Sequence, residues 1–99
     1  MKKMGNVFAK KSLEDDMITF RLTSKQLSRS SKKCEKNEAS NKAKLKQAIE
    51  KGNIDGARIY AENAIREKNQ ALNFLRLSSR IDAVASRLEA AVRMQQVKI

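Results

Sequence analysis

Six basic residues in the first half of the chain have the types and spacing best suited to binding a negatively charged partner. They are Arg21, Lys25, Arg29, Lys32, Lys33 and Lys36. On an α-helix, which turns by 100° for each residue, their side chains fall within an arc of about 120°. A row of cations on one helix face attracts polyanions through many weak contacts. The row therefore predicts a surface for an acidic membrane or a nucleic acid, or else a charged face that only contacts solvent.

The residues around this row favour lipid over nucleic acid. Proteins that bind single strands usually interleave aromatic residues with their cations, and this row contains none. It also lacks a recognisable set of residues for reading bases in a duplex. Ile18 and Leu22 lie at the N-terminal end of the same face, where apolar residues among cations suit insertion into a lipid interface. Packing beneath another helix explains Ile18 and Leu22 equally well. For the protein as a whole, the alternative functions are a basic nucleic-acid-binding protein or a coiled-coil scaffold.

Catalytic and metal-binding patterns are missing from the sequence. The chain has no histidine and one cysteine, Cys34, so we expect neither a metal cluster nor an internal disulfide. No paired carboxylates, no nucleophile with a base and no glycine-rich phosphate loop are recognisable. Cys34 falls on the packing side of its expected helix, which favours a small buried thiol. We therefore predict a protein that is not an enzyme and that uses no cofactor and no metal.

Long helices must position the basic row, because almost nothing in the chain interrupts a helix. Among 99 residues there are 3 glycines and no proline. We expect one helix from about residue 13 to 51 and a second from about 54 to 99, with a flexible basic N-terminus over residues 1–12. Both helices show the alternating spacing of four and three that is typical of helices packed along one another.

The expected packing rows can be read from this spacing. The first helix contributes Leu13, Met17, Phe20, Ser24, Leu27, Ser31 and Cys34. The second contributes Ile54, Ala57, Ala61, Ile65, Leu72, Leu75, Ala85, Leu88 and Val92. We expect Phe20, Leu27, Cys34, Ile65, Leu72 and Leu75 to be the main packing residues. Gly52 is expected as a left-handed helix cap and Asn53 as the N-cap of the next helix, so the sequence predicts an all-α antiparallel hairpin.

The charge is strongly asymmetric along the chain. The net charge is +11, of which residues 1–52 carry +8 and residues 53–99 carry +3. No apolar run reaches the roughly 18–20 residues that span a bilayer, and the N-terminus lacks an apolar signal core. Aromatic residues make up only 4% of this single domain, so its core must be small. We expect a cytoplasmic protein that is stabilised by association with copies of itself or with partners.

Three blocks of sequence resemble a known family. They are SRSSKKCEK at residues 28–36, KQAIEKGNIDGARIYAENAIR at residues 46–66 and NFLRLSSRIDAVASRLEAAV at residues 73–92. Together they closely resemble the charged multivesicular body proteins of the ESCRT-III family, in particular its first type, and the similarity covers about residues 17–94. Because several separate blocks match, the resemblance is far more specific than that of a generic coiled coil.

The resemblance implies a hairpin built from the family's first two helices and a role in membrane remodelling. Members polymerise on membranes with other ESCRT-III subunits, and they support endosomal sorting, multivesicular body formation and scission. Their basic hairpin surface faces acidic lipid, which carries membrane contact over to the six cations named above. The protein would then be peripheral on endosomal membranes. The resemblance also leads us to expect that the C-terminal helix with which the family recruits AAA ATPases is absent from this chain.

Overall fold

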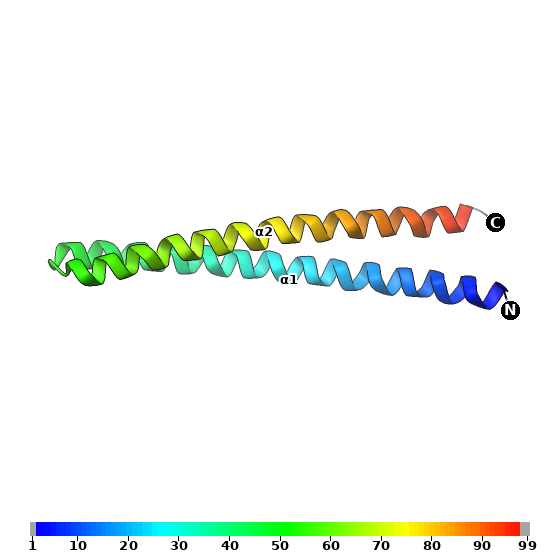
Figure 1. Ribbon diagram of the computed structural model, residues 1–99, viewed down its shortest axis with the longest axis horizontal. Coiled ribbons are helices and arrows are strands. Elements are labelled where there is room, and N and C mark those ends of the chain that lie inside the picture. The colour runs from blue at the N-terminus through cyan, green and yellow to red at the C-terminus, as the bar shows by residue number, and fades with distance from the viewer. Residues whose placement is uncertain (1, 98–99) are drawn as a thin grey trace. The chain divides into compact units, whose positions relative to one another are not determined.

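The computed structural model describes the backbone of residues 2–97 and the side chains of residues 12–94, and it contains two α-helices. Helix α1 spans Lys2–Glu50 and helix α2 spans Ile54–Val97 (Figure 1). The described residues contain no strand. The predicted fold class, an all-α helical hairpin, is confirmed.

The start of the first helix differs from the prediction. Helix α1 begins at Lys2, whereas the sequence favours a start near residue 13 and a flexible segment before it. Glu14, Asp15 and Asp16, acidic residues that would suit the first turn of a helix starting near residue 13, lie inside α1 instead. Gly5 is the one weak helix former early in this stretch, and a glycine costs only about 1 kcal/mol in a helix. At the other end α2 reaches Val97, and residues 98–99 lie outside the described residues.

The turn is closed by backbone hydrogen bonds at the end of α1. Gly52 has a φ of 74°, the left-handed conformation that favours glycine. Its N–H donates to the carbonyl oxygen of Ile49 at 3.1 Å, and the N–H of Asn53 donates to that of Ala48 at 2.8 Å. These two bonds form a Schellman motif, which satisfies carbonyl groups at the end of α1.

The side chain of Asn53 begins α2. Asn53 Oδ1 accepts a hydrogen bond from the N–H of Gly56 at 3.0 Å, and the Asn53 carbonyl oxygen accepts one from the N–H of Ala57 at 2.9 Å. A Cβ atom at position 56 would lie within 3 Å of the Asn53 side chain. Glycine at this position therefore leaves room for the cap, and Gly52 and Asn53 both lie in the turn where the sequence places them.

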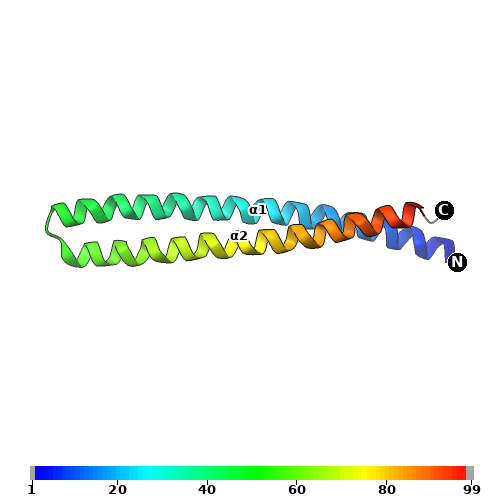
Figure 2. The ribbon, with the colours of Figure 1, turned by 90° about the horizontal axis from the view of Figure 1, so that it is seen from above.

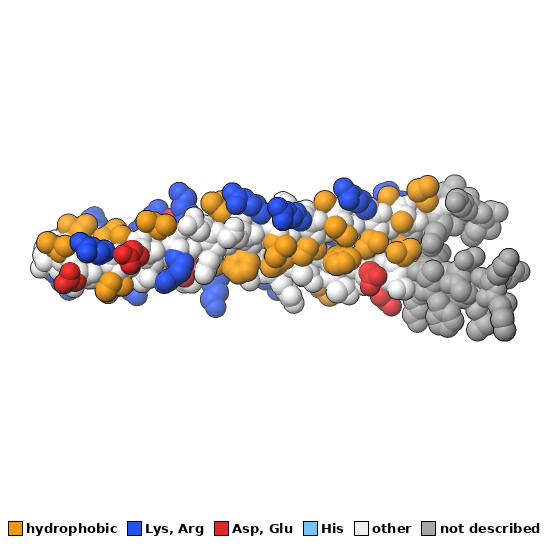
Figure 3. All heavy atoms as spheres, in the orientation of Figure 1, with side chains coloured by type: hydrophobic (Ala, Val, Ile, Leu, Met, Phe, Trp, Pro, Cys, Tyr) orange, Lys and Arg blue, Asp and Glu red, His pale blue; other side chains and the backbone are white. Residues whose placement is uncertain are grey.

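Contacts between the helices divide into two compact units, which we describe separately. The turn unit comprises Leu27–Arg76, and the terminal unit comprises Met1–Gln26 and Leu77–Ile99. In each unit a segment of α1 lies beside an antiparallel segment of α2, as both views show (Figures 1 and 2). In the terminal unit, hydrophobic side chains gather along the line where the helices meet (Figure 3).

Small residues at intervals of seven line the buried side of α2. In the turn unit they are Ala57, Ala64 and Ala71, and in the terminal unit Ser78, Ala85 and Val92, all of them buried. Ala85 is completely inaccessible to solvent. Small side chains allow two helix backbones to approach closely. A repeat of seven residues is the repeat of helices that pack along a continuous line.

The contacts from α1 follow the predicted row. Ser24, Ser31 and Cys34 are buried, and Phe20 and Leu27 are half-buried. In the turn unit, Ser31 Oγ donates a hydrogen bond to the carbonyl oxygen of Ala71 at 2.8 Å. A buried hydroxyl with a partner avoids the cost of an unsatisfied polar group, so serine serves here as a small and fully paired contact residue.

Three predicted packing residues of α2 are exposed rather than buried, which corrects the sequence interpretation. Ile65, Leu72 and Leu75 are 61%, 41% and 51% exposed. The buried residues Ala64 and Ala71 directly precede Ile65 and Leu72. A leucine or isoleucine in the contact would hold the helices further apart, so the close packing selects the row of small residues and leaves the neighbouring row of large ones outside.

Candidate anion-binding surface

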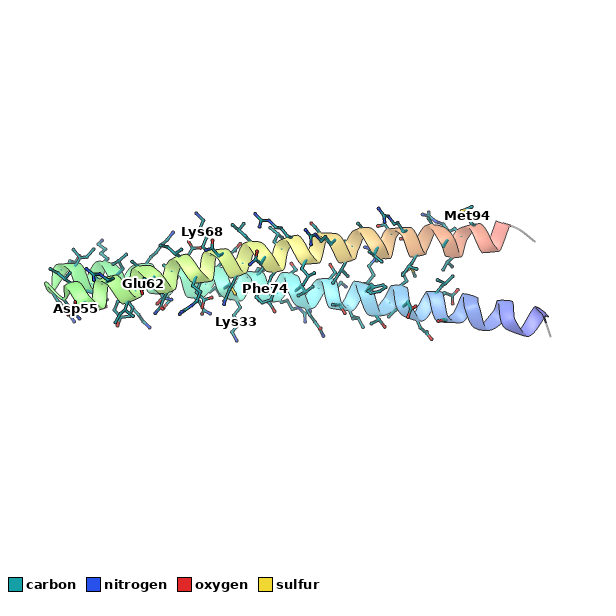
Figure 4. The ribbon with its side chains drawn as sticks, in the orientation of Figure 1. Lys33, Asp55, Glu62, Lys68, Phe74 and Met94 are labelled. Carbon is teal, nitrogen blue, oxygen red and sulfur yellow. The ribbon has the colours of Figure 1, made fainter. Side chains whose placement is uncertain are left out.

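Four of the six predicted cations lie in the turn unit on the outer side of α1. Arg29, Lys32, Lys33 and Lys36 are all exposed. They lie on the side of α1 that faces away from the buried Ser31 and Cys34, and Lys33 points away from the helix contact (Figure 4). The helix therefore separates its packing side from its cationic side, as the sequence predicts.

The terminal unit places Lys25 beside two apolar residues. Lys25 is exposed, and Ile18 and Leu22 are each 56% exposed. Neither apolar side chain packs beneath α2, because the buried side of α1 in this unit is formed by the row that includes Ser24. A cation next to two exposed aliphatic side chains makes a small amphipathic surface of the kind that suits a lipid interface.

Arg21 differs from the other cations because it contacts two carboxylates of α2. Its Nη1 atom lies 3.5 Å from Asp82 Oδ1, and its Nη2 atom lies 3.2 Å from Glu89 Oε2. The Arg21 side chain keeps 43% of its exposure. Asp82 and Glu89 are one heptad apart, so both reach the same guanidinium group. Its charge is locally balanced within the terminal unit, and this weakens the prediction that Arg21 serves an external anion.

The turn unit as a whole carries an excess of positive charge. Its sequence holds 12 basic and 6 acidic residues. One of these cations is paired within α1, because Lys42 Nζ lies 3.0 Å from Glu38 Oε2. An ion pair between residues four apart on a helix contributes only about 0.3–0.5 kcal/mol. The surplus cations therefore remain available to an external polyanion.

Cys34 is a buried thiol in the turn unit. Burial raises the pKa of the Cys34 thiol above its ordinary value, and the neighbouring Glu67 raises it further, while Lys33 opposes the shift. The Sγ atom makes only a weak contact with Gln70 Oε1, at 3.9 Å. A raised pKa leaves little thiolate at neutral pH, and thiolate is the reactive form.

The part of the chain with described side chains contains no group of three or more potential ligand residues that could hold a metal ion. Neither helix contains, within its described residues, a segment that is apolar and long enough to cross a bilayer.

Two features escaped the sequence interpretation. The first is the pairing of Arg21, for which the seven-residue interval between Asp82 and Glu89 was the available signal. The second is a set of exposed arginines on α2. They include Arg66, Arg76, Arg80 and Arg87. In the terminal unit, basic side chains project from the edge formed by α2 (Figure 3), so cations are not confined to α1.

Comparison with known proteins decides the family. No protein-family model matches the chain. It is 64% identical to charged multivesicular body protein 1 of Dictyostelium discoideum over 85 residues, and these matched residues cover 86% of this chain and 44% of that protein. It is 51% identical over 94 residues to the ESCRT-related protein CHMP1B of Arabidopsis thaliana, which covers 95% of this chain and 45% of that protein. The chain belongs to the charged multivesicular body protein 1 family of ESCRT-III.

The human relative has a similar relationship to the chain. Charged multivesicular body protein 1b of Homo sapiens is 57% identical over 75 residues, which cover 76% of this chain and 38% of that protein. The chain therefore spans less than half the length of the charged multivesicular body protein 1 relatives that it matches. Their names describe a multivesicular body component or an ESCRT-related protein, and none of the three describes an enzyme.

Proposed function

We propose that this hairpin belongs to an ESCRT-III subunit that polymerises on acidic membranes and supports endosomal sorting, multivesicular body formation and membrane scission. The observation that carries the proposal is the exposed cationic side of α1, opposite its packing side, in a chain 64% identical to a charged multivesicular body protein. The expected location is cytoplasmic and peripheral on endosomal membranes. Expected partners are other copies of this chain and other ESCRT-III subunits. An AAA ATPase is a further expected partner, through the part of the longer relatives that lies outside the matched residues.

In this mechanism the membrane is held by the sum of weak contacts. Each Lys or Arg near an acidic lipid surface contributes about 1 kcal/mol. Lys25, Arg29, Lys32, Lys33 and Lys36 supply this attraction. Arg21 contributes less because Asp82 and Glu89 contact it already. A polymer multiplies these contacts, so modest attraction by one subunit becomes firm attachment by many.

Ile18 and Leu22 complete the proposed membrane contact in the terminal unit. Both are more than half exposed, and aliphatic side chains of this size gain free energy when they leave water. Their entry between lipid headgroups would add a contribution that salt does not screen. The electrostatic contribution, in contrast, weakens as ionic strength rises.

Charge reversal tests the proposal. Replacing Lys25, Arg29, Lys32 and Lys36 with Glu should abolish sedimentation with vesicles that contain phosphatidylserine, while the helical circular dichroism stays unchanged. The control reverses four charges on the other helix. It replaces Arg66, Arg76, Arg80 and Arg87 with Glu. Because the net charge changes equally, retained binding by the control assigns the effect to α1, and equal loss in both variants contradicts the assignment.

A nucleic-acid function is the second candidate, and a competition experiment separates the two. Protein bound to acidic vesicles at physiological salt is challenged with duplex DNA or single-stranded RNA of equal phosphate concentration. We expect the vesicles to retain the protein because the row lacks aromatic residues for base stacking. Displacement by either nucleic acid would favour the alternative.

A further inference from the structure

The turn unit carries an exposed row on α2 directly beside the buried alanines. We call it the α2 outer row. It comprises Ile54, Arg58, Ala61, Ile65, Lys68, Leu72 and Leu75, all of them exposed except the half-buried Ala61. The intervals alternate between four and three, so these residues lie along one side of the helix. Ile54 is 72% exposed and Ile65 is 61% exposed, which leaves a line of large aliphatic side chains without a partner in the described hairpin.

Cations are interleaved with these apolar residues. Arg58 and Lys68 belong to the α2 outer row itself and are exposed, and Lys68 points away from the helix contact (Figure 4). None of the seven residues is acidic. Apolar side chains alternating with cations along one side of a helix are typical of a helix that lies in the interface of an acidic membrane.

The neighbouring side of α1 adds further cations. Lys32 follows the buried Ser31 by one residue, just as Leu72 follows the buried Ala71. In an antiparallel pair, positions one residue after the contact lie on the same side of both helices. The hydrogen bond between Ser31 and Ala71 fixes the two helices at this level. Lys32 therefore flanks the α2 outer row near Leu72.

Charge decides which occupant fits the α2 outer row. A second copy packed through the same row would bring its own cations against Arg58 and Lys68, and the turn unit holds twice as many basic as acidic residues. Like charges brought together oppose association. An acidic lipid surface instead neutralises the cations, and its acyl region accepts the aliphatic side chains.

We propose that the α2 outer row inserts Ile65, Leu72 and Leu75 into the interface of an acidic bilayer, so that the turn unit contacts lipid through both helices. The inference rests on the proposed membrane function and extends it from α1 to α2. The long stems of Arg58 and Lys68 allow their charged ends to reach phosphate groups while the aliphatic side chains enter below them.

A fluorescent label at single positions tests insertion. Cys34→Ala removes the native thiol, and Leu72→Cys or Asn73→Cys then provides one site for an environment-sensitive nitrobenzoxadiazole probe. Asn73 is the matched control because it is adjacent and exposed but lies outside the α2 outer row. With vesicles of phosphatidylcholine and phosphatidylserine, the probe at position 72 should shift to the blue and brighten, and the probe at position 73 should change little.

The outcomes separate the two proposals. Sedimentation with vesicles that persists without any change at position 72 overturns insertion but leaves the proposed membrane function standing. A blue shift at position 72 that depends on protein concentration and occurs without vesicles identifies a second copy as the occupant, and it also overturns insertion. Loss of all vesicle binding by the unlabelled native chain overturns both proposals.

A pair of substitutions gives an independent measurement. Ile65→Asn with Leu72→Asn should lower the vesicle partition coefficient at least about tenfold, since each aliphatic side chain moved out of water contributes about this factor or more. Ile59→Asn is the control, because Ile59 is 56% exposed but lies outside the row. Unchanged helical circular dichroism verifies folding, and equal partition of the double variant and the native chain overturns the inference.

Discussion

The turn unit and the terminal unit hold their two helices together by different means. In the turn unit the chain itself joins the helices, and Gly52 and Asn53 fix the ends of α1 and α2 through backbone and cap hydrogen bonds. Across its contact, Ser31 donates to a backbone carbonyl. The terminal unit does not include the turn, and its helices are held side by side by hydrogen bonds and ion pairs that side chains make.

The side-chain contacts of the terminal unit are correspondingly richer. Ser78 Oγ donates to the carbonyl oxygen of Ser24 at 3.0 Å, and the two hydroxyl oxygens lie 2.9 Å apart. Ser24 Oγ also lies 3.3 Å from the Ser78 carbonyl oxygen. Arg21 adds its contacts with Asp82 and Glu89. Polar contacts of fixed geometry define the alignment of two helices more strictly than small apolar residues do.

Enlarging a buried alanine should have the largest effect on stability. Ala85→Leu in the terminal unit and Ala64→Leu in the turn unit should each lower the free energy of unfolding by about 1–3 kcal/mol, because extra methylene groups force closely packed helices apart. Urea unfolding followed by circular dichroism measures this change. Ala83→Leu is the control, since Ala83 is exposed.

The rate at which Cys34 reacts with a thiol reagent sharpens the same comparison. Burial raises the pKa of the Cys34 thiol, so its reaction at neutral pH should be slow and should report opening of the turn unit. We expect Ala64→Leu to accelerate labelling more than Ala85→Leu does. Equal acceleration by both variants would mean that the two units open together.

Loss of the α2 cap should have the next largest effect. Asn53→Ala removes the acceptor for the Gly56 N–H and should lower the free energy of unfolding by about 1 kcal/mol. Lys51→Ala is a suitable control, because the Lys51 side chain is exposed and only its backbone N–H bonds in the turn. A decrease no greater than that of the control would show that the backbone bonds alone hold the turn.

Removing one serine of the terminal unit should cost slightly less. Ser78→Ala deletes the hydroxyl that donates to Ser24 and should lower the free energy of unfolding by about 0.5–1.5 kcal/mol. Ser79→Ala changes an exposed neighbour and serves as the control. In a double-mutant cycle with Ser24→Ala, we expect the two losses to be non-additive because the residues share a contact. Additive losses would contradict this coupling.

The Arg21 ion pairs should have the smallest effect. Their groups are each close to half exposed, so Arg21→Gln should lower the free energy of unfolding by about 0.2–1 kcal/mol, and less at high salt. Arg80→Gln removes the same charge from another exposed position. In vesicle sedimentation, Arg21→Gln should weaken binding less than Lys25→Gln, whereas an equal loss would show that Arg21 is available to lipid.

The sequence was sufficient for the presence of two helices, for the turn and for the packing row of α1, but not for the start of α1 at Lys2. Gly52 and Asn53 each have a local reason for their position, and the contact side of α1 mixes serine and cysteine with large residues in one unambiguous row. The cations on its opposite side follow from the same periodicity. These features depend on residues close together in sequence, so spacing alone could predict them.

The packing row of α2 was predicted only in part: Ala57, Ala85 and Val92 are buried as expected, but the large residues Ile65 and Leu72 are exposed. Two adjacent rows of α2 have heptad spacing, one with Ala64 and Ala71 and the other with Ile65 and Leu72. Hydrophobicity favours the second row, but the distance between the helices favours the first. That distance depends on the partner helix. The pairing of Arg21 with Asp82 was missed for the same reason, because it requires the alignment of two segments far apart in sequence.

The turn between Glu50 and Ile54 has a consequence for the rotational phase of α2. Each residue of an α-helix rotates the following side chains by about 100° about its axis. One residue deleted between the turn and Ala57 would rotate α2 so that its alanines leave α1 and Ile65 and Leu72 take their positions. The length of this short link therefore determines which line of α2 side chains is buried against α1 in the turn unit and which line is exposed.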